Sequence, residues 1–461
     1  MALSATIAHK ARIAYQRFGL GALKGGPQSL GTGSSAAYNA LLAELNSTTI
    51  ASITDSTLPS YAVAATQSQD GFSPADTICQ LELQARRTKV MLPKIGFVER
   101  LVMFWSNHFS ISINKDQTTR GMLGQLERDV IRKNVLGKFS NMLLGVIQHP
   151  AMICFLDNED SMGPNSPTGL DWGRSYNENL GREILELHTL GVGGGYTQAD
   201  VTSLAKVITG WSYVRGWEAD NGWNGGTQAN RGQFIYRDSW HEPASATILG
   251  KTYSNTGQAQ GQAVLKDLAI HPSTAQHIAY KLVCHFITDT PTTAMVTPIA
   301  NAFKSSGGDL KATAKALIDL PASWSAPFTK IRTPYELWMA QLRAFGGPAI
   351  PMDQRWVIEE PLRALDHLPW ERLTPDGYPD ESYYWLAPDA MRIREDTSLF
   401  FYDVFGSTYL GPAYTGPAAA TLATSLFDAD FSASSLAAVK SFSDQRRAMA
   451  TLFMTPEFQR R

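Results

Sequence analysis

A charged stretch between Asn177 and Thr189, with the sequence NENLGREILELHT, is the strongest candidate for chemistry in this chain. If it forms a helix, a rotation of 100° per residue gathers its polar side chains within about 140° of one another. The opposite arc is apolar except for His188, so the pattern predicts one packed face and one face turned to water or to a site. The polar face contains Glu178, Asn179, Arg182, Glu183, Glu186 and Thr189.

Two carboxylates on this face have the spacing of an acid/base pair. Glu183 and Glu186 are three residues apart, which places their Cβ atoms about 5–6 Å apart on a helix. Two carboxyl groups at this separation can titrate at different pH values, so that one donates a proton while the other stays ionised. Arg182 would hold their ionisation or a substrate anion. We therefore expect Glu183, Glu186 and Arg182 to be catalytic.

Two other interpretations of the same face stay open. Glu178, Arg182 and Glu186 also form an i, i+4 ladder, which stabilises a helix by a few tenths of a kcal/mol per pair and needs no further role. Alternatively, the carboxylates bind a divalent cation with help from His108 or His241. The di-iron bundle signature requires Glu-x-x-His, whereas Glu186 and His188 are separated by one residue only, which disfavours that kind of metal site.

Further polar and aromatic residues are expected to bind substrate. His108 ends an apolar segment, and Asn177 and Asn179 flank Glu178 at the start of the charged stretch. Trp240 and His241 lie in a stretch rich in tryptophan and glycine, where flat rings suit stacking on sugars. Of the nine histidines, His241 is expected to be the most accessible.

Common catalytic motifs are absent. Leu249-Gly250-Lys251-Thr252 looks like the end of a phosphate-binding loop, but Ser245 stands where that loop requires glycine. Gly191-Val192-Gly193 follows a predicted helix, whereas the dinucleotide fingerprint must follow a strand. The sequence contains no His-Glu-x-x-His, Cys-x-x-Cys or Gly-x-Ser-x-Gly motif. These observations exclude the standard nucleotide-binding, metalloprotease and α/β-hydrolase classes.

Composition limits the class of protein further. The 461 residues include 40 Lys and Arg against 42 Asp and Glu, a formal net charge of −2, so no basic field exists to attract nucleic acid. The three cysteines, Cys79, Cys154 and Cys284, are far apart, which is typical of buried free thiols. No apolar stretch approaches the ~20 residues that span a bilayer, and the first 17 residues lack the apolar core of a secretion signal.

Hydrophobic periodicity predicts a mostly α fold. A core helix is expected over 94–109, two helices over 119–147, and a helix from Thr197 that begins with a capping box. Between 212 and 254 aromatic and glycine residues alternate with polar ones, which predicts an irregular excursion with one possible β-hairpin. We expect one unit over 1–461, divided into an N-terminal helical part (1–211), the excursion (212–254), a second helical part (255–346) and a Pro-, Tyr- and Trp-rich tail with closing helices (347–461).

Several longer motifs together resemble one known family. They are Trp105-Ser106-Asn107-His108-Phe109, Asn177–Asp200, His241-Glu242-Pro243 leading to Leu249–Thr252, His271–Ala275, Pro375–Asp380 and Thr455–Phe458. Along nearly its whole length the chain resembles the bacterial family catalogued as domain of unknown function 1800. The resemblance implies a helical single unit but no particular reaction. Members are often exported and often encoded beside a sulfatase-like family, which points to envelope or extracellular polymers. Gly181 stands where the family has alanine, which slightly weakens the helix.

Together these observations predict a hydrolase-like enzyme, resembling a glycosidase, that acts on a polar, carbohydrate-containing substrate through the paired carboxylates. This reading requires no cofactor. The alternatives are a metal-dependent enzyme that uses the same face, with a divalent metal as cofactor, and a binding or assembly protein in which the charged helix is a structural ion-pair core. The expected partner is a small molecule or glycan. The chain is expected to be exported if a leader has been removed and cytoplasmic otherwise.

Overall fold

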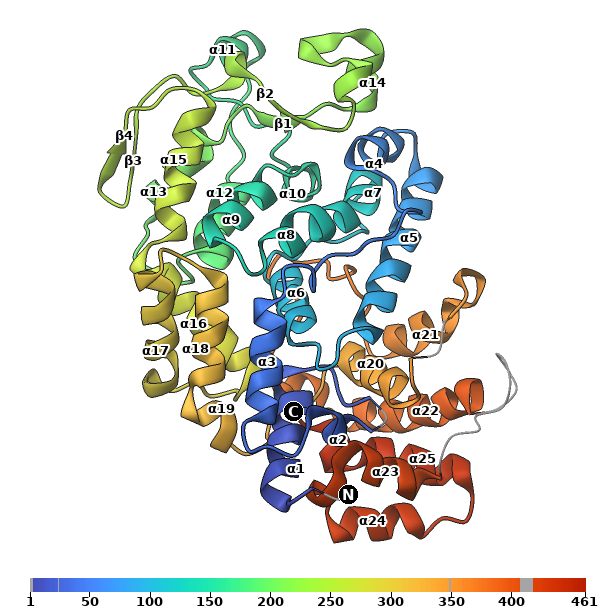
Figure 1. Ribbon diagram of the computed structural model, residues 1–461. Helices are drawn as coiled ribbons and strands as arrows, with labels where there is room; N and C mark the ends of the chain where they lie inside the picture. The colour runs from blue at the N-terminus through green and yellow to red at the C-terminus, as the bar shows by residue number, and fades with distance from the viewer. Residues whose placement is uncertain (1–2, 24, 348–349, 407–417) are drawn as a thin grey trace.

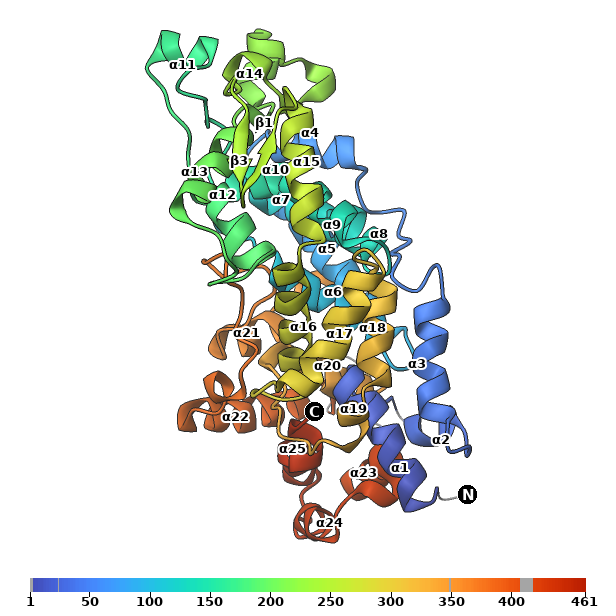
Figure 2. The same ribbon diagram turned by 90° about the vertical axis from the view of Figure 1, so that its left-hand side faces the viewer.

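The computed structural model describes residues 3–23, 25–347, 350–406 and 418–461, so residues 348–349 and 407–417 of the expected tail lie outside the described residues. The chain forms a single, mostly helical body, which confirms the predicted fold class (Figure 1). The strand-containing region lies at one end of this body and the last helices at the other (Figures 1 and 2). The first helix, α1 (Ala5–Arg12), contacts the closing segment through an ion pair of 3.1 Å between Arg12 and Asp430.

The expected core helix is present and crosses the middle of the molecule. It is α6 (Phe97–His108), in which even Glu99 and Arg100 are buried. The two helices expected over 119–147 are also confirmed: α7 (Gln117–Leu126) continues through a π-helical turn, η2 (Glu127–Ile131), whereas α9 (Phe139–Ile147) forms a separate helix. The core therefore surrounds α6, and any polar group on this helix needs a partner inside the protein.

The excursion contains two small antiparallel pairs of strands. Strand β1 (Trp211–Tyr213) pairs with β2 (Phe234–Tyr236), and β3 (Ala246–Ile248) pairs with β4 (Lys251–Tyr253). The second pair is a tight hairpin whose two turn residues, Leu249 and Gly250, have φ angles of 50° and 74°, as a type I′ turn requires. The segment that looks like a phosphate loop is thus a hairpin turn.

The remaining elements are mostly helices. Thr197 caps α13 as expected, in a reciprocal capping box with Asp200. No helix in the described ranges is long and apolar enough to cross a membrane, and all three cysteines are buried and free. The other α-helices of ten or more residues are α3 (Ala36–Asn46), α5 (Phe72–Met91), α13 (Gln198–Val207), α15 (Gln258–Ala269), α16 (Pro272–Phe286), α17 (Thr293–Ser305), α18 (Leu310–Asp319), α20 (Pro334–Ala344), α22 (Pro388–Phe405) and α25 (Gln445–Met454).

Shorter helical segments connect these. They are η1 (Ile13–Phe18), α2 (Gly26–Leu30), α4 (Tyr61–Ser68), η2 (Glu127–Ile131), α8 (Arg132–Asn134), α10 (Pro150–Phe155), α11 (Pro167–Trp172), α12 (Asn179–Glu183), η3 (Ile184–His188), α14 (Gly216–Asn221), η4 (Trp223–Gly225), η5 (Gln228–Asn230), η6 (Asp238–Trp240), α19 (Pro321–Ser325), η7 (Met352–Gln354), α21 (Trp356–Ala364), η8 (Ser382–Trp385), α23 (Ala419–Phe427), η9 (Asp428–Asp430), α24 (Ala433–Lys440) and α26 (Pro456–Gln459). Of these, η1, η2 and η3 are π-helical.

Candidate functional site

The charged stretch forms a helix that changes type in the middle of its polar face. It is α-helical in α12, from Asn179 to Glu183, and π-helical in η3, from Ile184 to His188. The predicted ladder is present, because Arg182 lies 3.1 Å from Glu178 and 3.4 Å from Glu186. A π-helical turn widens the helix and is frequent at functional sites. The change of type falls between the two expected catalytic carboxylates.

Glu183 occupies a half-buried position among other acidic groups. Burial raises its pKa, and the carboxylates of Glu186 and Asp376 raise it further, while Arg182 opposes them. Asp376 belongs to the segment 372–380 near the end of the chain, so the structure adds a third acidic residue that the helix alone does not contain. This position favours the protonated form of Glu183, the state that a general acid needs.

Glu178 differs from Glu183 although both lie on the same helix. It accepts hydrogen bonds from Thr202 and Gln198 of α13, in addition to its contact with Arg182. These bonds, with that of Thr202 the largest contribution, lower the pKa of Glu178. Glu178 therefore joins α12 to α13 as an ionised carboxylate.

Three histidines meet on the apolar side of this helix: the buried His188 of η3, the buried His108 and the half-buried His277. The ring of His108 lies 6.2 Å from that of His188 and 6.1 Å from that of His277. His108 and His277 make 3.1 Å hydrogen bonds to the backbone carbonyls of His188 and Leu187. Burial lowers the pKa of each ring, to about 3 for His188 and about 4 for His277. His108 thus contacts the backbone of the helix on its apolar side and does not reach the carboxylate face.

The other residues expected to bind substrate are buried or make hydrogen bonds to nearby parts of the chain. Asn177 accepts a hydrogen bond from the amide of Asn179 and donates one to the carbonyl of Asp157, which anchors the preceding loop. Trp240 is completely buried, and Arg237 lies over its ring. The expectation that His241 is accessible is wrong: it is 6% exposed, and its Nδ1 lies 3.1 Å from the carbonyl of Thr209.

The geometry does not favour the metal alternative. Among residues 3–23, 25–347, 350–406 and 418–461, no group of three or more His, Cys, Asp or Glu side chains is arranged to hold a metal ion. The carboxylates of the charged helix also do not pair with Arg128 or Arg132, as they would in a purely structural ion-pair core. Arg128 pairs instead with Glu82, and Arg132 pairs with Glu99 and Glu127.

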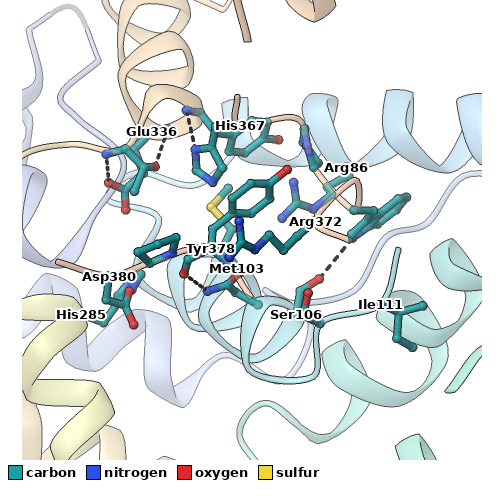
Figure 3. A pocket seen from close by; sticks show the side chains of 17 residues that line it. Arg86, Met103, Ser106, Ile111, His285, Glu336, His367, Arg372, Tyr378 and Asp380 are labelled. Carbon is teal, nitrogen blue, oxygen red and sulfur yellow. Dashed lines mark hydrogen bonds and ion pairs between the residues drawn. The ribbon is translucent and has the colours of Figure 1, made fainter. Parts of the chain in front are cut away.

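A second polar region, which sequence reasoning missed, is lined in part by Arg372, Tyr378 and Asp380 of the segment 372–380. It is a chamber with a cavity of about 80 Å³, shown in Figure 3. Asn107 at the end of α6 fixes one wall, since its amide donates to the carbonyl of Tyr378 (2.8 Å) and accepts from the amide of Tyr378 (2.7 Å). Gly377 has a φ of 79°, and a Cβ there would lie 2.5 Å from the carbonyl oxygen of Asn107. The chain can pass so close to Asn107 only with glycine.

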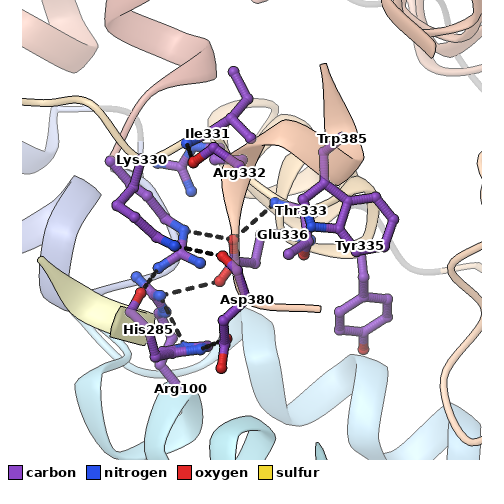
Figure 4. A network of polar contacts seen from close by, with 12 residues as sticks. Arg100, His285, Lys330, Ile331, Arg332, Thr333, Tyr335, Glu336, Asp380 and Trp385 are labelled. Atoms are coloured by element: carbon purple, nitrogen blue, oxygen red, sulfur yellow. Dashed lines mark hydrogen bonds and ion pairs between the residues drawn. The ribbon is translucent and has the colours of Figure 1, made fainter. Parts of the chain in front are cut away.

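An ion-pair network, shown in Figure 4, contributes His285, Glu336 and Asp380 to the lining of this chamber. Its centre is the buried Glu336 of α20, which lies 3.0 Å from Arg100 and 2.8 Å from Arg461. Burial opposes ionisation of Glu336, but these two arginines outweigh it and hold the pKa far below its ordinary range. The carboxylate is therefore ionised and fully paired.

His285 connects this network to the segment 372–380. Its Nε2 lies 3.0 Å from Arg100, which can only donate, so the ring proton is on Nδ1, 2.6 Å from Asp380. Burial lowers the pKa of His285 to about 4, so the ring is neutral at pH 7. Burial also works against ionisation of Asp380, but His285, Lys281 and Lys330 lower its pKa to about 2.

The network residues lie far apart in the sequence, which is why no spacing pattern revealed them. Two local signs were available: Arg100 interrupts an apolar helix, and Glu336 follows Thr333 and Pro334 at a helix start. Both are also explained by ordinary helix chemistry, so neither identifies a partner.

Comparison with known proteins identifies the family of this chain. The family model described as "Protein of unknown function (DUF1800)" matches residues 13–460. This chain belongs to the DUF1800 family. The match covers almost the whole chain, including both the charged helix and the chamber, and it confirms the resemblance seen in the sequence. No curated protein and no solved structure matches the chain, so family membership assigns no reaction.

Proposed function

We propose that this DUF1800 protein is a hydrolase that acts on a polar, carbohydrate-containing substrate at the exposed edge of α12 and η3. Glu183 is the general acid, and the carboxylate of Glu186, paired with Arg182, is the base or nucleophile. The observation that carries the proposal is the position of Glu183, half-buried and close enough to the carboxylates of Glu186 and Asp376 for both to raise its pKa. A proton donor for a leaving oxygen has to be protonated near neutral pH, and these surroundings favour that state.

The partition of roles follows from the different partners of the two carboxylates. Glu186 lies 3.4 Å from Arg182, whereas no hydrogen bond or ion pair of Glu183 occurs within the described residues. An unpaired, partly desolvated carboxyl group next to a paired one is the arrangement by which two acids take opposite roles. The segment 372–380, which carries Asp376, would form the opposite wall of the substrate site.

The test is the release of 4-nitrophenol from a panel of 4-nitrophenyl glycosides. We expect Glu183→Gln to lower kcat by about 10²–10⁴-fold, the usual contribution of a general acid. The decline of kcat/KM on the basic side of its pH profile should lie above the ordinary range of a glutamate, because the acid must remain protonated. Glu360→Gln, which changes an exposed glutamate, serves as the matched control.

Three outcomes would contradict the proposal. The first is a folded Glu183→Gln variant with unchanged kcat, and the second is a folded wild-type protein that hydrolyses no glycoside of the panel. The third is loss of the folded state in Glu183→Gln, measured by circular dichroism, which would mean that the face is structural.

A further inference from the structure

The chamber of Figure 3 contains polar groups that no part of the described chain satisfies. Within the described residues, Arg86 of α5 makes hydrogen bonds only through Nε, 2.9 Å from Glu127, and its buried Nη1 has no partner. The hydroxyl of Tyr335 and Nε of Arg372 are also buried, and neither has a partner in the part of the chain that the structure describes. Buried polar groups without partners are rare and costly, so several around one cavity point to a missing ligand.

The free groups are hydrogen-bond donors. Both arginines can only donate. His367 accepts a hydrogen bond of 3.2 Å at Nδ1 from the amide of Tyr335, and burial lowers its pKa to about 3, so the ring is neutral with its proton on Nε2. That Nε2 has no hydrogen-bond partner among the described residues. A ligand that satisfies these groups must therefore be an acceptor.

The surroundings of Arg86 favour a flat acceptor. Its guanidinium lies 5.0 Å from the centre of the Tyr335 ring and 5.6 Å from that of Trp370, so aromatic groups restrict the space around it. The two Nη atoms of an arginine form a planar fork that matches the two oxygens of a carboxylate. A cavity of about 80 Å³ has room for only about five to eight water-sized positions, which is the size of a small organic acid.

The charged residues around the chamber favour a ligand with a single negative charge. Glu127 already compensates Arg86, while Arg372 lies 3.5 Å from Asp376 and 6.0 Å from the centre of the Tyr378 ring. The carboxylates of Glu336 and Asp380 also line the chamber, and they would repel a doubly charged anion such as phosphate more strongly.

We propose that this chamber is a binding site for a small monocarboxylate, or for the carboxylate group of a larger ligand. Arg86 and Tyr335 bind the two oxygens, and Arg372 and His367 donate from the other walls. The site is separate from the one assigned to Glu183, since neither Glu183 nor Glu186 is among the described residues that line the chamber, and the proposal does not depend on the hydrolase activity.

The experiment uses acetate as the probe and the full chain as it exists. Binding is followed by the broadening of the acetate methyl resonance in NMR spectra as protein is added, and Kd is obtained by titration. Tyr335→Phe should raise Kd about tenfold, the loss expected for one hydrogen bond to a charged group. Without acetate the variant should be at least as stable as the wild type, because the hydroxyl that it loses has no partner.

A second variant and a control complete the design. Arg86→Lys keeps the charge beside Glu127 but removes the fork, and it should raise Kd by about tenfold or more. Tyr280→Phe, which changes an exposed tyrosine, should leave Kd unchanged. The proposal is overturned if acetate does not bind, if both variants bind it as the wild type does, or if inorganic phosphate binds more tightly than acetate.

Discussion

The charged face of α12 and η3 and the network around Glu336 contain the same residue types in opposite surroundings. In the network, Glu336 is buried and paired with two arginines. On the helix face, Glu183 is half-buried, has acidic neighbours and shares a single nearby arginine. The pKa of Glu336 is accordingly lowered, whereas that of Glu183 is raised. Residue type alone thus does not separate a structural carboxylate from a reactive one; the balance of partners does.

Neutral histidines contact both the charged helix and the network. His108 and His277 contact the backbone of the charged helix, and His285 connects the network to the segment 372–380. Burial lowers the pKa of seven of the nine histidines. They are His108, His149, His188, His271, His277, His285 and His367.

The largest expected effect is therefore acid unfolding. Because the folded pKa of each of these histidines is below its unfolded value of about 6.5, the unfolded chain binds more protons as the pH falls. Their contribution to stability is complete above that value and is lost as the pH falls toward 4; for His285 alone it is on the order of 3 kcal/mol. Urea unfolding at pH 7.5, 6 and 5 should give steadily smaller free energies of unfolding. Constant stability down to pH 4.5 would show that the histidines are not held neutral.

Substitution in the network should have the next largest effect. Glu336→Gln leaves Arg100 and Arg461 buried without their carboxylate, so we expect a loss of about 3–5 kcal/mol in the free energy of unfolding, measured with urea. Glu360→Gln, on the surface, should change it by less than about 0.5 kcal/mol. If Glu336→Gln and Glu360→Gln are equally stable, burial and pairing do not distinguish the network around Glu336 from the charged helix face.

The sequence predicts the helices well because periodicity acts over a few turns. The core helix over 94–109 and the capping box at Thr197 both follow from neighbouring residues, and both are present. The network does not follow, since Arg100, Glu336 and Arg461 meet only through the tertiary fold. The contact between the excursion and the loop before the charged helix also depends on the tertiary fold. There the amide of Gly163 donates a hydrogen bond to the carbonyl of Trp240.

The candidate site was only partly predictable for a related reason. Regular helix geometry brings Arg182 to Glu178 and Glu186, and the structure has both contacts. It does not predict the π-helical turn that begins directly after Glu183 and contains Glu186. It also does not predict Asp376, which comes from a distant segment.

A smaller effect is expected for Glu183→Gln. Because burial, Glu186 and Asp376 raise the pKa of Glu183 in the folded state, the wild type loses stability as the pH rises through that pKa. The neutral glutamine avoids this loss, so the variant should be as stable as the wild type at pH 4 and slightly more stable at pH 8, by no more than about 0.5 kcal/mol. Urea unfolding at the two pH values measures the difference. A variant that is less stable at pH 8 would place Glu183 with the structural carboxylates.

An effect of similar size on stability is expected for Arg182→Ala, which removes two i, i+4 ion pairs that are about one-third exposed. Such pairs contribute about 0.3–0.5 kcal/mol each, so the loss should stay below about 1 kcal/mol. Arg392→Ala, which removes an exposed i, i+4 pair with Asp396, is the matched control. The pH profile should separate the two variants. Arg182 lowers the pKa of Glu183, so its removal should move the basic limb of kcat/KM for glycoside hydrolysis to higher pH. An unchanged limb in an active variant would mean that Glu183 is not the group that titrates.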